Sequence, residues 1–179
     1  LENLLAASLT AYLAGCSGEQ IRRKMATLPE IPFRQQIVFK NKRLTIVNDT
    51  TATSPDGAIA AVKRFGGPRT ILIAGGTDRQ LDFRQWGKIV PRFIKSGNLI
   101  LLSGTATDKM LAILPGARRL DVQVFDTLAE AFVTALQKAR GLPSAVVLFS
   151  PGAKSFEKFK NEYDRGKKFN ALVRKELGR

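Results

Sequence analysis

The sequence predicts an α/β protein in which helices cover both faces of a mostly parallel, six-stranded sheet. Two observations support this class. From residue 36 onward, short apolar runs alternate with amphipathic segments, and strands that alternate with crossover helices form parallel sheets. The runs 71–73 and 99–102 contain only apolar residues, as central strands buried on both faces require. The expected architecture has three layers and is Rossmann-like, with a short helical segment before it.

The helical segment occupies residues 1–28. Leu5 and Leu9 belong to a set of apolar residues at helical spacing, which predicts a first helix. Ser17 followed by Gln20 forms a capping box, which predicts the start of a second helix. The segment is therefore expected to be two short helices.

A linker separates these helices from the rest of the chain. The run Leu-Pro-Glu-Ile-Pro at 28–32 breaks regular structure, because proline lacks a backbone donor and restricts the residue before it. The chain is therefore divided into residues 1–32, a helical part with a linker, and residues 33–179, one α/β domain. Strands are expected at 36–39, 44–48, 70–74, 98–102, 122–125 and 145–149. Helices are expected at 55–65, 82–96, 107–114, 128–138 and 157–177, the last with a break near Gly166.

Composition excludes several classes of protein. Lys and Arg number 29 against 15 Asp and Glu, a net charge of +14, but the basic residues are spread along the chain without a nucleic-acid-binding motif, so no nucleic-acid partner is expected. The chain has no His and only Cys16, which excludes an internal disulfide and a Cys/His metal cluster. No apolar run approaches the roughly 20 residues that cross a bilayer. The chain begins without a signal sequence or an initiator Met, and we expect a monomeric, cytoplasmic piece of a longer protein.

Polar clusters follow the predicted strands, where ligands collect in parallel α/β folds. The segment 48–57 is rich in hydroxyls and carboxylates, which can cap the next helix or hold a ribose and an amino acid. The glycine pair and Arg79 in the segment 75–83 suit either a plain turn or a loop that binds a carboxylate. The segment 150–166 follows a buried strand, and we expect it to open a helix whose N-terminus, beside Ser155, binds a small anion.

These clusters occur in the order of the motifs of one enzyme family. The family pattern is an Arg after a Leu-Pro-rich linker, then NDSKATN, then GGxDKxxDF, then SPxxxSFDxFKNFxxRG. Here these become Arg34, Asn48-Asp-Thr-Thr-Ala-Thr-Ser54, Gly75-Gly-Thr-Asp-Arg-Gln-Leu-Asp-Phe83 and the segment 150–166. The chain thus resembles, over nearly its whole length, the C-terminal domain of the Mur ligases, in particular those that add D-glutamate. Residues 1–32 resemble the end of the family's central ATPase domain together with the linker.

The resemblance implies an ATP-dependent ligase that adds D-glutamate to UDP-N-acetylmuramoyl-L-alanine during synthesis of peptidoglycan precursors. The family positions that hold D-glutamate are occupied here by Thr53, Arg79, Ser155 and Phe156. The positions that contact ATP are occupied by Arg34 and Asp49, and the secondary candidates beside the site are Asn48, Thr51 and Lys154. The family's phosphate loop and Mg²⁺ ligands lie in other domains, so ATP and Mg²⁺ would act in the whole protein. This chain alone is expected to be inactive.

Three of the departures from the family pattern bear on the site. Thr51 and Arg79 stand where the family usually has Lys, and Glu162 stands where it has Phe. The change at Thr51 removes a cation from a site for an acid, so the identity of the acid stays open. Absence of the DNPR motif found in other branches favours a small dicarboxylic amino acid. Two other interpretations remain: another Mur-type or folylpolyglutamate-type ligase, and a stand-alone basic Rossmann-like module that binds nucleotides or nucleic acid.

Overall fold

The computed structural model describes residues 2–119 and 121–178. The chain divides into two compact units, residues 1–31 and residues 32–179, and the second unit contains the whole sheet. No helix among the described residues is both long enough and apolar enough to cross a membrane.

The first unit consists of α1 (Glu2–Leu13) and α2 (Gly18–Ala26). The predicted capping box starts α2: the Gln20 backbone N–H donates to Ser17 Oγ at 3.2 Å, and the Ser17 N–H donates to Gln20 Oε1 at 2.8 Å. Large apolar side chains of the unit stay exposed, among them Leu9 and Leu13. The unit by itself therefore buries little apolar surface, and helices this short gain most of their stability from packing.

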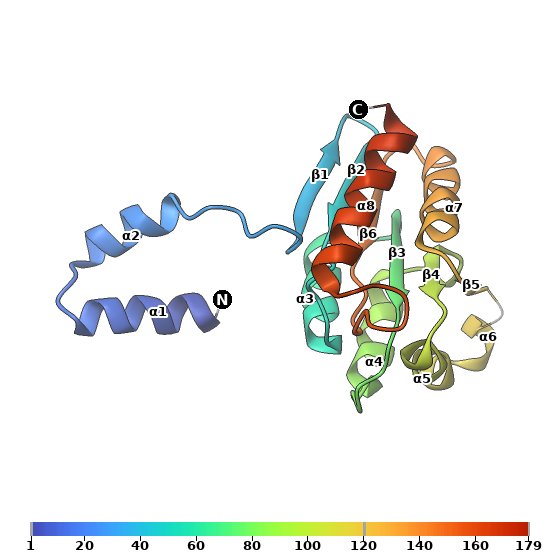
Figure 1. Cartoon of the computed structure of the whole chain (residues 1–179), viewed down its shortest axis with the longest axis horizontal. Coiled ribbons are helices and arrows are strands. Elements are labelled where there is room, and N and C mark those ends of the chain that lie inside the picture. The colour runs from blue at the N-terminus through green and yellow to red at the C-terminus, as the bar shows by residue number, and fades with distance from the viewer. Residues whose placement is uncertain (1, 120, 179) are drawn as a thin grey trace. The chain divides into compact units, whose positions relative to one another are not determined.

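The second unit is built on one six-stranded sheet with the order β1-β2-β6-β3-β4-β5 (Figure 1). Its strands are β1 (Gln36–Lys40), β2 (Leu44–Asn48), β3 (Thr70–Gly75), β4 (Leu99–Leu102), β5 (Gln123–Phe125) and β6 (Ala145–Phe149). β1 lies at one edge and pairs antiparallel with β2, and all other pairs are parallel. The predicted fold class is confirmed. Every predicted strand is present, and no strand end differs from its prediction by more than one residue.

β6 is the common neighbour of β2 and β3. Its last residue, Phe149, pairs in register with Asn48, the last residue of β2, and with Ile73 of β3. The three strands therefore end at nearly the same level of the sheet. The loops that follow them begin side by side at the carboxyl edge.

Helices cover both faces of the sheet, as predicted. They are α3 (Pro55–Phe65), α4 (Arg84–Phe93), α5 (Thr105–Ile113), α6 (Gly116–Arg119), α7 (Leu128–Arg140) and α8 (Glu162–Leu177). One apolar layer lies between the sheet and α3, α4 and α5, and the other between the sheet and α7 and α8 (Figure 1). Successive residues of β3 alternate between the two layers: Leu72 and Ala74 belong to the first, Ile71 and Ile73 to the second.

The helix predicted for 157–177 begins later than expected. α8 starts at Glu162, and residues 156–161 form turns and bends. The Asn161 side chain fixes this start, because its Oδ1 accepts the Asp164 backbone N–H at 2.8 Å. The helix predicted at 82–96 is also shorter, spanning only Arg84–Phe93, and α6 was not predicted.

The break predicted near Gly166 is wrong, since α8 continues through it. Gly166 serves close packing instead. A Cβ at this position would lie 2.6 Å from Thr50 Cγ2 and 2.7 Å from Phe33 Cγ, closer than real contacts allow. The glycine therefore lets α8 approach both the end of β2 and the residue after the linker.

Candidate ligand-binding site

Three loops meet at the carboxyl edge of the sheet. They are the β2 loop (49–54), the β3 loop (76–83) and the β6 loop (150–161). Backbone hydrogen bonds join the β6 loop to both of the others: the Gly152 N–H donates to Ala52 O at 2.9 Å, and the Thr77 N–H donates to Lys154 O at 2.9 Å. The loops therefore form one surface, and they contain most of the predicted site residues.

Asp49 opens the β2 loop and is buried, with an exposed fraction of 2%. Burial raises the pKa of Asp49 from 3.8 to about 6. Two hydrogen bonds act in the opposite direction: the Ser150 hydroxyl donates to Oδ2 at 2.6 Å, and the Gln35 N–H donates to Oδ1 at 2.9 Å. The charge of Arg34, which is exposed, also lowers the pKa of Asp49. The two residues predicted to contact ATP are thus electrostatically coupled, with Asp49 fixed and Arg34 open to solvent.

Two of the secondary candidates make contacts within the fold. The Asn48 amide donates to Gly166 O at 3.0 Å and to Asn170 Oδ1 at 2.7 Å, which ties β2 to α8. The Thr51 hydroxyl donates to Phe33 O at 2.9 Å. The residue that replaces the usual lysine therefore anchors the start of the domain in this conformation.

Four other predicted residues form two pairs on these loops. Lys154 Nζ donates to Thr53 Oγ1 at 3.2 Å. The Arg79 guanidinium lies over the exposed Phe156 ring, with Cζ 4.8 Å from the ring centroid. Stacking orients the guanidinium plane, so its edge can present two N–H groups to one carboxylate. The structure thus supplies two cationic groups, each held by a neighbouring side chain.

Ser155 lies between Lys154 and Phe156 in the sequence of the β6 loop and is only 3% exposed. Its hydroxyl has no hydrogen-bond partner among the described residues. The expected position at a helix N-terminus is wrong, because Ser155 O instead closes a turn by accepting the N–H groups of Lys158 at 3.2 Å and Phe159 at 2.9 Å. A buried hydroxyl without a partner costs free energy. A ligand that forms a hydrogen bond with it would recover that cost.

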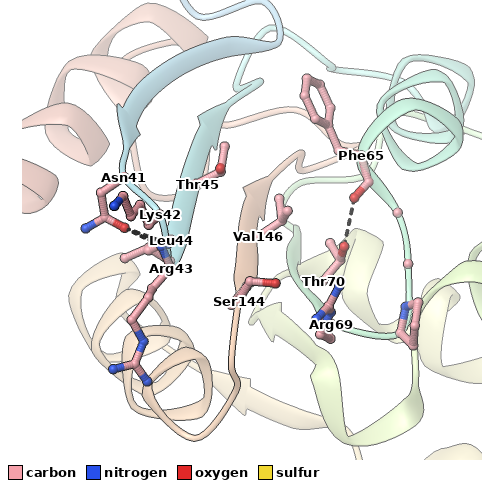
Figure 2. Close-up of a pocket in the computed structure, with 14 residues that line it drawn as sticks. Asn41, Lys42, Arg43, Leu44, Thr45, Phe65, Arg69, Thr70, Ser144 and Val146 are labelled. Carbon is pink, nitrogen blue, oxygen red and sulfur yellow. Dashed lines mark hydrogen bonds between the residues drawn. The ribbon is translucent and has the colours of Figure 1, made fainter.

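Another hollow lies at the opposite, amino-terminal edge of the sheet (Figure 2). Its lining includes Lys42, Arg43 and Arg69, and none of the described residues that line it is acidic. Figure 2 shows the Thr70 hydroxyl bonded to the Phe65 carbonyl, at 2.7 Å, where α3 ends. Basic side chains are stabilised near the C-terminal end of a helix, because that end carries a partial negative charge. This effect is consistent with basic residues in the lining. Because parallel strands collect ligands at their carboxyl ends, we place the candidate site in the three loops.

Comparisons with known proteins give close relatives in sequence. No family model matches the chain. It is 37% identical over 178 residues to a UDP-N-acetylmuramoylalanine–D-glutamate ligase of Roseiflexus sp. (strain RS-1), a match that covers 97% of this chain and 36% of the relative. It is 30% identical over 179 residues to a protein of the same name from Prochlorococcus marinus (strain MIT 9312), covering 99% of this chain and 37% of the relative. The chain thus spans little more than a third of the length of these relatives.

Solved structures give the same answer for the fold. MurF from Acinetobacter baumannii matches with a TM-score of 0.66 at 16% identity, over 97% of this chain and 37% of that one. Nearly the whole chain is thus similar in sequence to D-glutamate-adding Mur ligases and in fold to a solved Mur ligase. A folylpolyglutamate synthase of Mycobacterium tuberculosis, solved with ADP and AMPPCP, matches with a TM-score of 0.60 at 14% identity over 97% and 38%. At these identities the likeness concerns the fold of the Mur ligase domain alone.

The Mur ligase pattern contains one residue that the sequence analysis did not select. Arg165 of α8, in the last motif, is 1% exposed. Its Nε donates to Thr50 Oγ1 at 2.8 Å, and its Nη2 donates to Thr50 O at 2.8 Å and Ala153 O at 3.1 Å. Its Nη1 donates to Lys154 O at 3.2 Å. Burial lowers the pKa of Arg165 to about 9. The guanidinium therefore fastens the β2 loop to the β6 loop, and its motif position was the one signal in the sequence.

Proposed function

We propose that the whole protein is an ATP-dependent ligase that joins D-glutamate to UDP-N-acetylmuramoyl-L-alanine, and that this chain supplies the D-glutamate site. One observation carries the proposal: the buried hydroxyl of Ser155 has no partner among the described residues, and its chain neighbours Lys154 and Phe156 each belong to a pair that holds a cationic group, Lys154 with Thr53 and Arg79 with Phe156. An amino acid with two carboxylates offers an anion to each cation and an acceptor to the hydroxyl. The name borne by relatives at 30% and 37% identity supports the same choice.

Each side chain has a role in this proposal. Arg79, braced on Phe156, binds one carboxylate through two N–H groups. Lys154, oriented by Thr53, binds the other, and Ser155 donates a hydrogen bond to the carboxylate that lies deeper. Arg79 and Lys154 together supply the positive charge that Thr51 no longer provides.

The proposed reaction has two steps. The γ-phosphoryl group of ATP is transferred to the carboxylate of UDP-N-acetylmuramoyl-L-alanine, which gives an acyl phosphate and ADP. The amine of D-glutamate then attacks the acyl carbon, a C–N bond forms, inorganic phosphate leaves and the amine loses a proton. Such chemistry depends mainly on positioning and on charge stabilisation. The loops of this chain would fix the attacking amine by holding both carboxylates.

ATP would meet this chain at Arg34 and Asp49, which form one wall of the proposed nucleotide site. Mg²⁺ would neutralise phosphate charge in the whole enzyme. The part of the chain that the structure describes contains no group of three or more His, Cys, Asp or Glu side chains that could hold a metal ion. Following the family pattern, we assign the metal and the phosphate loop to the remainder of the protein.

Phosphate release by two proteins tests the proposal. The complete protein should release phosphate only when ATP, UDP-N-acetylmuramoyl-L-alanine and D-glutamate are all present, and this chain alone should release none. Turnover by this chain alone would refute the proposed division of roles. A complete protein that ignores D-glutamate would refute the proposed substrate.

A second candidate is a related ligase that adds a different acid, which the exchange of lysine for Thr51 favours. Without the lysine at position 51, the site has one cation fewer to bind the carboxylates of D-glutamate, so a different acid could be the substrate. Competition among D-glutamate, L-glutamate and D-aspartate in the complete protein separates the two candidates. Preference for D-glutamate by kcat/KM supports the first, and preference for either competitor supports the second.

A further inference from the structure

A hydrogen-bond network outside the proposed ligand contacts joins the β3 and β6 loops. Its centre is Thr105, the first residue of α5. The Thr105 hydroxyl donates to Glu157 Oε1 at 2.6 Å and accepts the Asp78 backbone N–H at 2.9 Å. The Glu157 N–H in turn donates to Thr77 Oγ1 at 3.0 Å. The loop that carries Arg79 and the loop that carries Ser155 are therefore bound to the same helix start.

The network lies where the backbones before α5 and in the β3 loop approach each other and the Glu157 side chain closely. Gly104, just before α5, has a φ of 154°, and a Cβ there would lie 2.5 Å from Gly76 O and 2.7 Å from Glu157 Oε2. The Ala106 N–H also donates to Gly76 O at 2.9 Å. The close fit means that a shift of any of these three segments is transmitted to the others.

Charge supports the same arrangement. Glu157 places a carboxylate at the N-terminus of α5, and the Thr105 backbone N–H donates to its Oε2 at 3.4 Å. Negative groups are favoured at this end of a helix. Lys109, on the same helix, binds the Asp78 carboxylate at 2.5 Å. α5 therefore holds the β6 loop through one carboxylate and the β3 loop through another.

The residues held in this way are direct chain neighbours of the proposed ligand contacts. Asp78 precedes Arg79, and Glu157 follows Phe156. We propose that Glu157 is a positioning residue which, through Thr105 and Thr77, sets the stacking of Arg79 on Phe156 and so the fit of the amino-acid substrate. This inference rests on the proposed function. Because Glu157 acts on the geometry of the amino-acid site, its loss should affect binding of D-glutamate and leave ATP binding unchanged.

Steady-state kinetics of the complete enzyme test this role. Glu157→Gln and Thr105→Val should each raise the KM for D-glutamate about fivefold or more, because each removes a charge-assisted hydrogen bond from the network. The kcat and the KM for ATP should stay within about twofold of the parent values. Thr105→Ser keeps the hydroxyl, so its KM for D-glutamate should equal that of the unsubstituted enzyme.

A matched pair elsewhere in the chain controls for loss of stability. Thr127 Oγ1 donates to Glu130 Oε2 at 2.7 Å in the capping box of α7, and both residues lie outside the three loops. Thr127→Val and Glu130→Gln should lower the melting temperature at least as much as Thr105→Val and Glu157→Gln do, without changing the KM for D-glutamate. Equal KM changes in both pairs would show a general stability effect and overturn the proposal.

Amide hydrogen exchange in this chain reads the network directly. Thr105→Val should speed exchange of the Asp78 N–H about tenfold, since it loses its acceptor, and Thr105→Ser should leave it unchanged. Protection that survives Thr105→Val would overturn the proposal. In the kinetic test, absence of D-glutamate-dependent activity in the unsubstituted complete enzyme refutes the proposed function. If that enzyme is active but Glu157→Gln leaves the KM for D-glutamate unchanged, only the role of Glu157 is refuted.

Discussion

Ser155→Ala should separate stability from ligand binding. The Ser155 hydroxyl is buried and has no hydrogen-bond partner in the described part of the chain, and such a group costs about 1–3 kcal/mol when left unsatisfied. Removing it should therefore leave the free energy of unfolding unchanged or raise it by up to about 1 kcal/mol, a rise of roughly 2–4 °C in melting temperature for a chain of this size. A lost hydrogen bond to a substrate carboxylate costs about 1.5–3 kcal/mol. The KM for D-glutamate should accordingly rise about tenfold or more.

Thermal unfolding of this chain and kinetics of the complete enzyme measure the two effects. Ser150→Ala is the matched control, because Ser150 is equally buried in the β6 loop but its hydroxyl donates to Asp49 at 2.6 Å. Ser150→Ala should lower the melting temperature, whereas Ser155→Ala should not. The KM for ATP should barely change in Ser155→Ala. A clear loss of stability in Ser155→Ala, with equal effects on both substrates, would show that the hydroxyl serves folding.

Three further predictions concern charge, pH and packing. Arg79→Ala should lower kcat/KM for D-glutamate at least about tenfold more than Thr51→Ala does, and the reverse order would refute the charge assignment. Because burial raises the pKa of Asp49 to about 6, the folded state binds a proton more tightly than the unfolded state. The free energy of unfolding should therefore fall by up to about 3 kcal/mol as pH rises from 4 to 6 and beyond, and Asp49→Asn should remove this component, as denaturant titrations at each pH would reveal. Gly166→Ala should lower the free energy of unfolding by about 1–3 kcal/mol, because the added methyl group crowds Phe33 and Thr50. An unchanged midpoint of denaturant unfolding would mean that these side chains move aside.

The sheet and the order of the site loops were predictable from the sequence. A central strand of a parallel sheet is buried on both faces and therefore contains only apolar residues. Runs such as 71–73 can thus be recognised as strands without knowing which strands pair with them. Parallel topology then places the segments after the strands at one edge. The contact between Arg79 and Phe156 was not predictable in this way. The two residues belong to motifs that are far apart in the chain, and only the fold brings them together.

The parts that were missed depend on contacts between distant segments. Residues 156–160 have a composition compatible with a helix, but the Asn161 cap and the turn closed by Ser155 O shift the helix start to Glu162. Gly166 breaks isolated helices by propensity, yet tertiary packing against Phe33 outweighs that cost. Arg165 is one basic residue among 29, and its role depends on backbone carbonyls that composition cannot reveal.

The shared level at which β2, β3 and β6 end has a consequence for how this domain can vary in length. Phe149 pairs with both Asn48 and Ile73, so an insertion or deletion inside any of these strands would shift one loop relative to the other two and reverse the faces of its side chains. An insertion at the opposite edge, such as in the turn around Asn41, leaves the register untouched. Natural gains and losses of residues should therefore gather at that far edge, while the three strands keep a constant spacing to their loops.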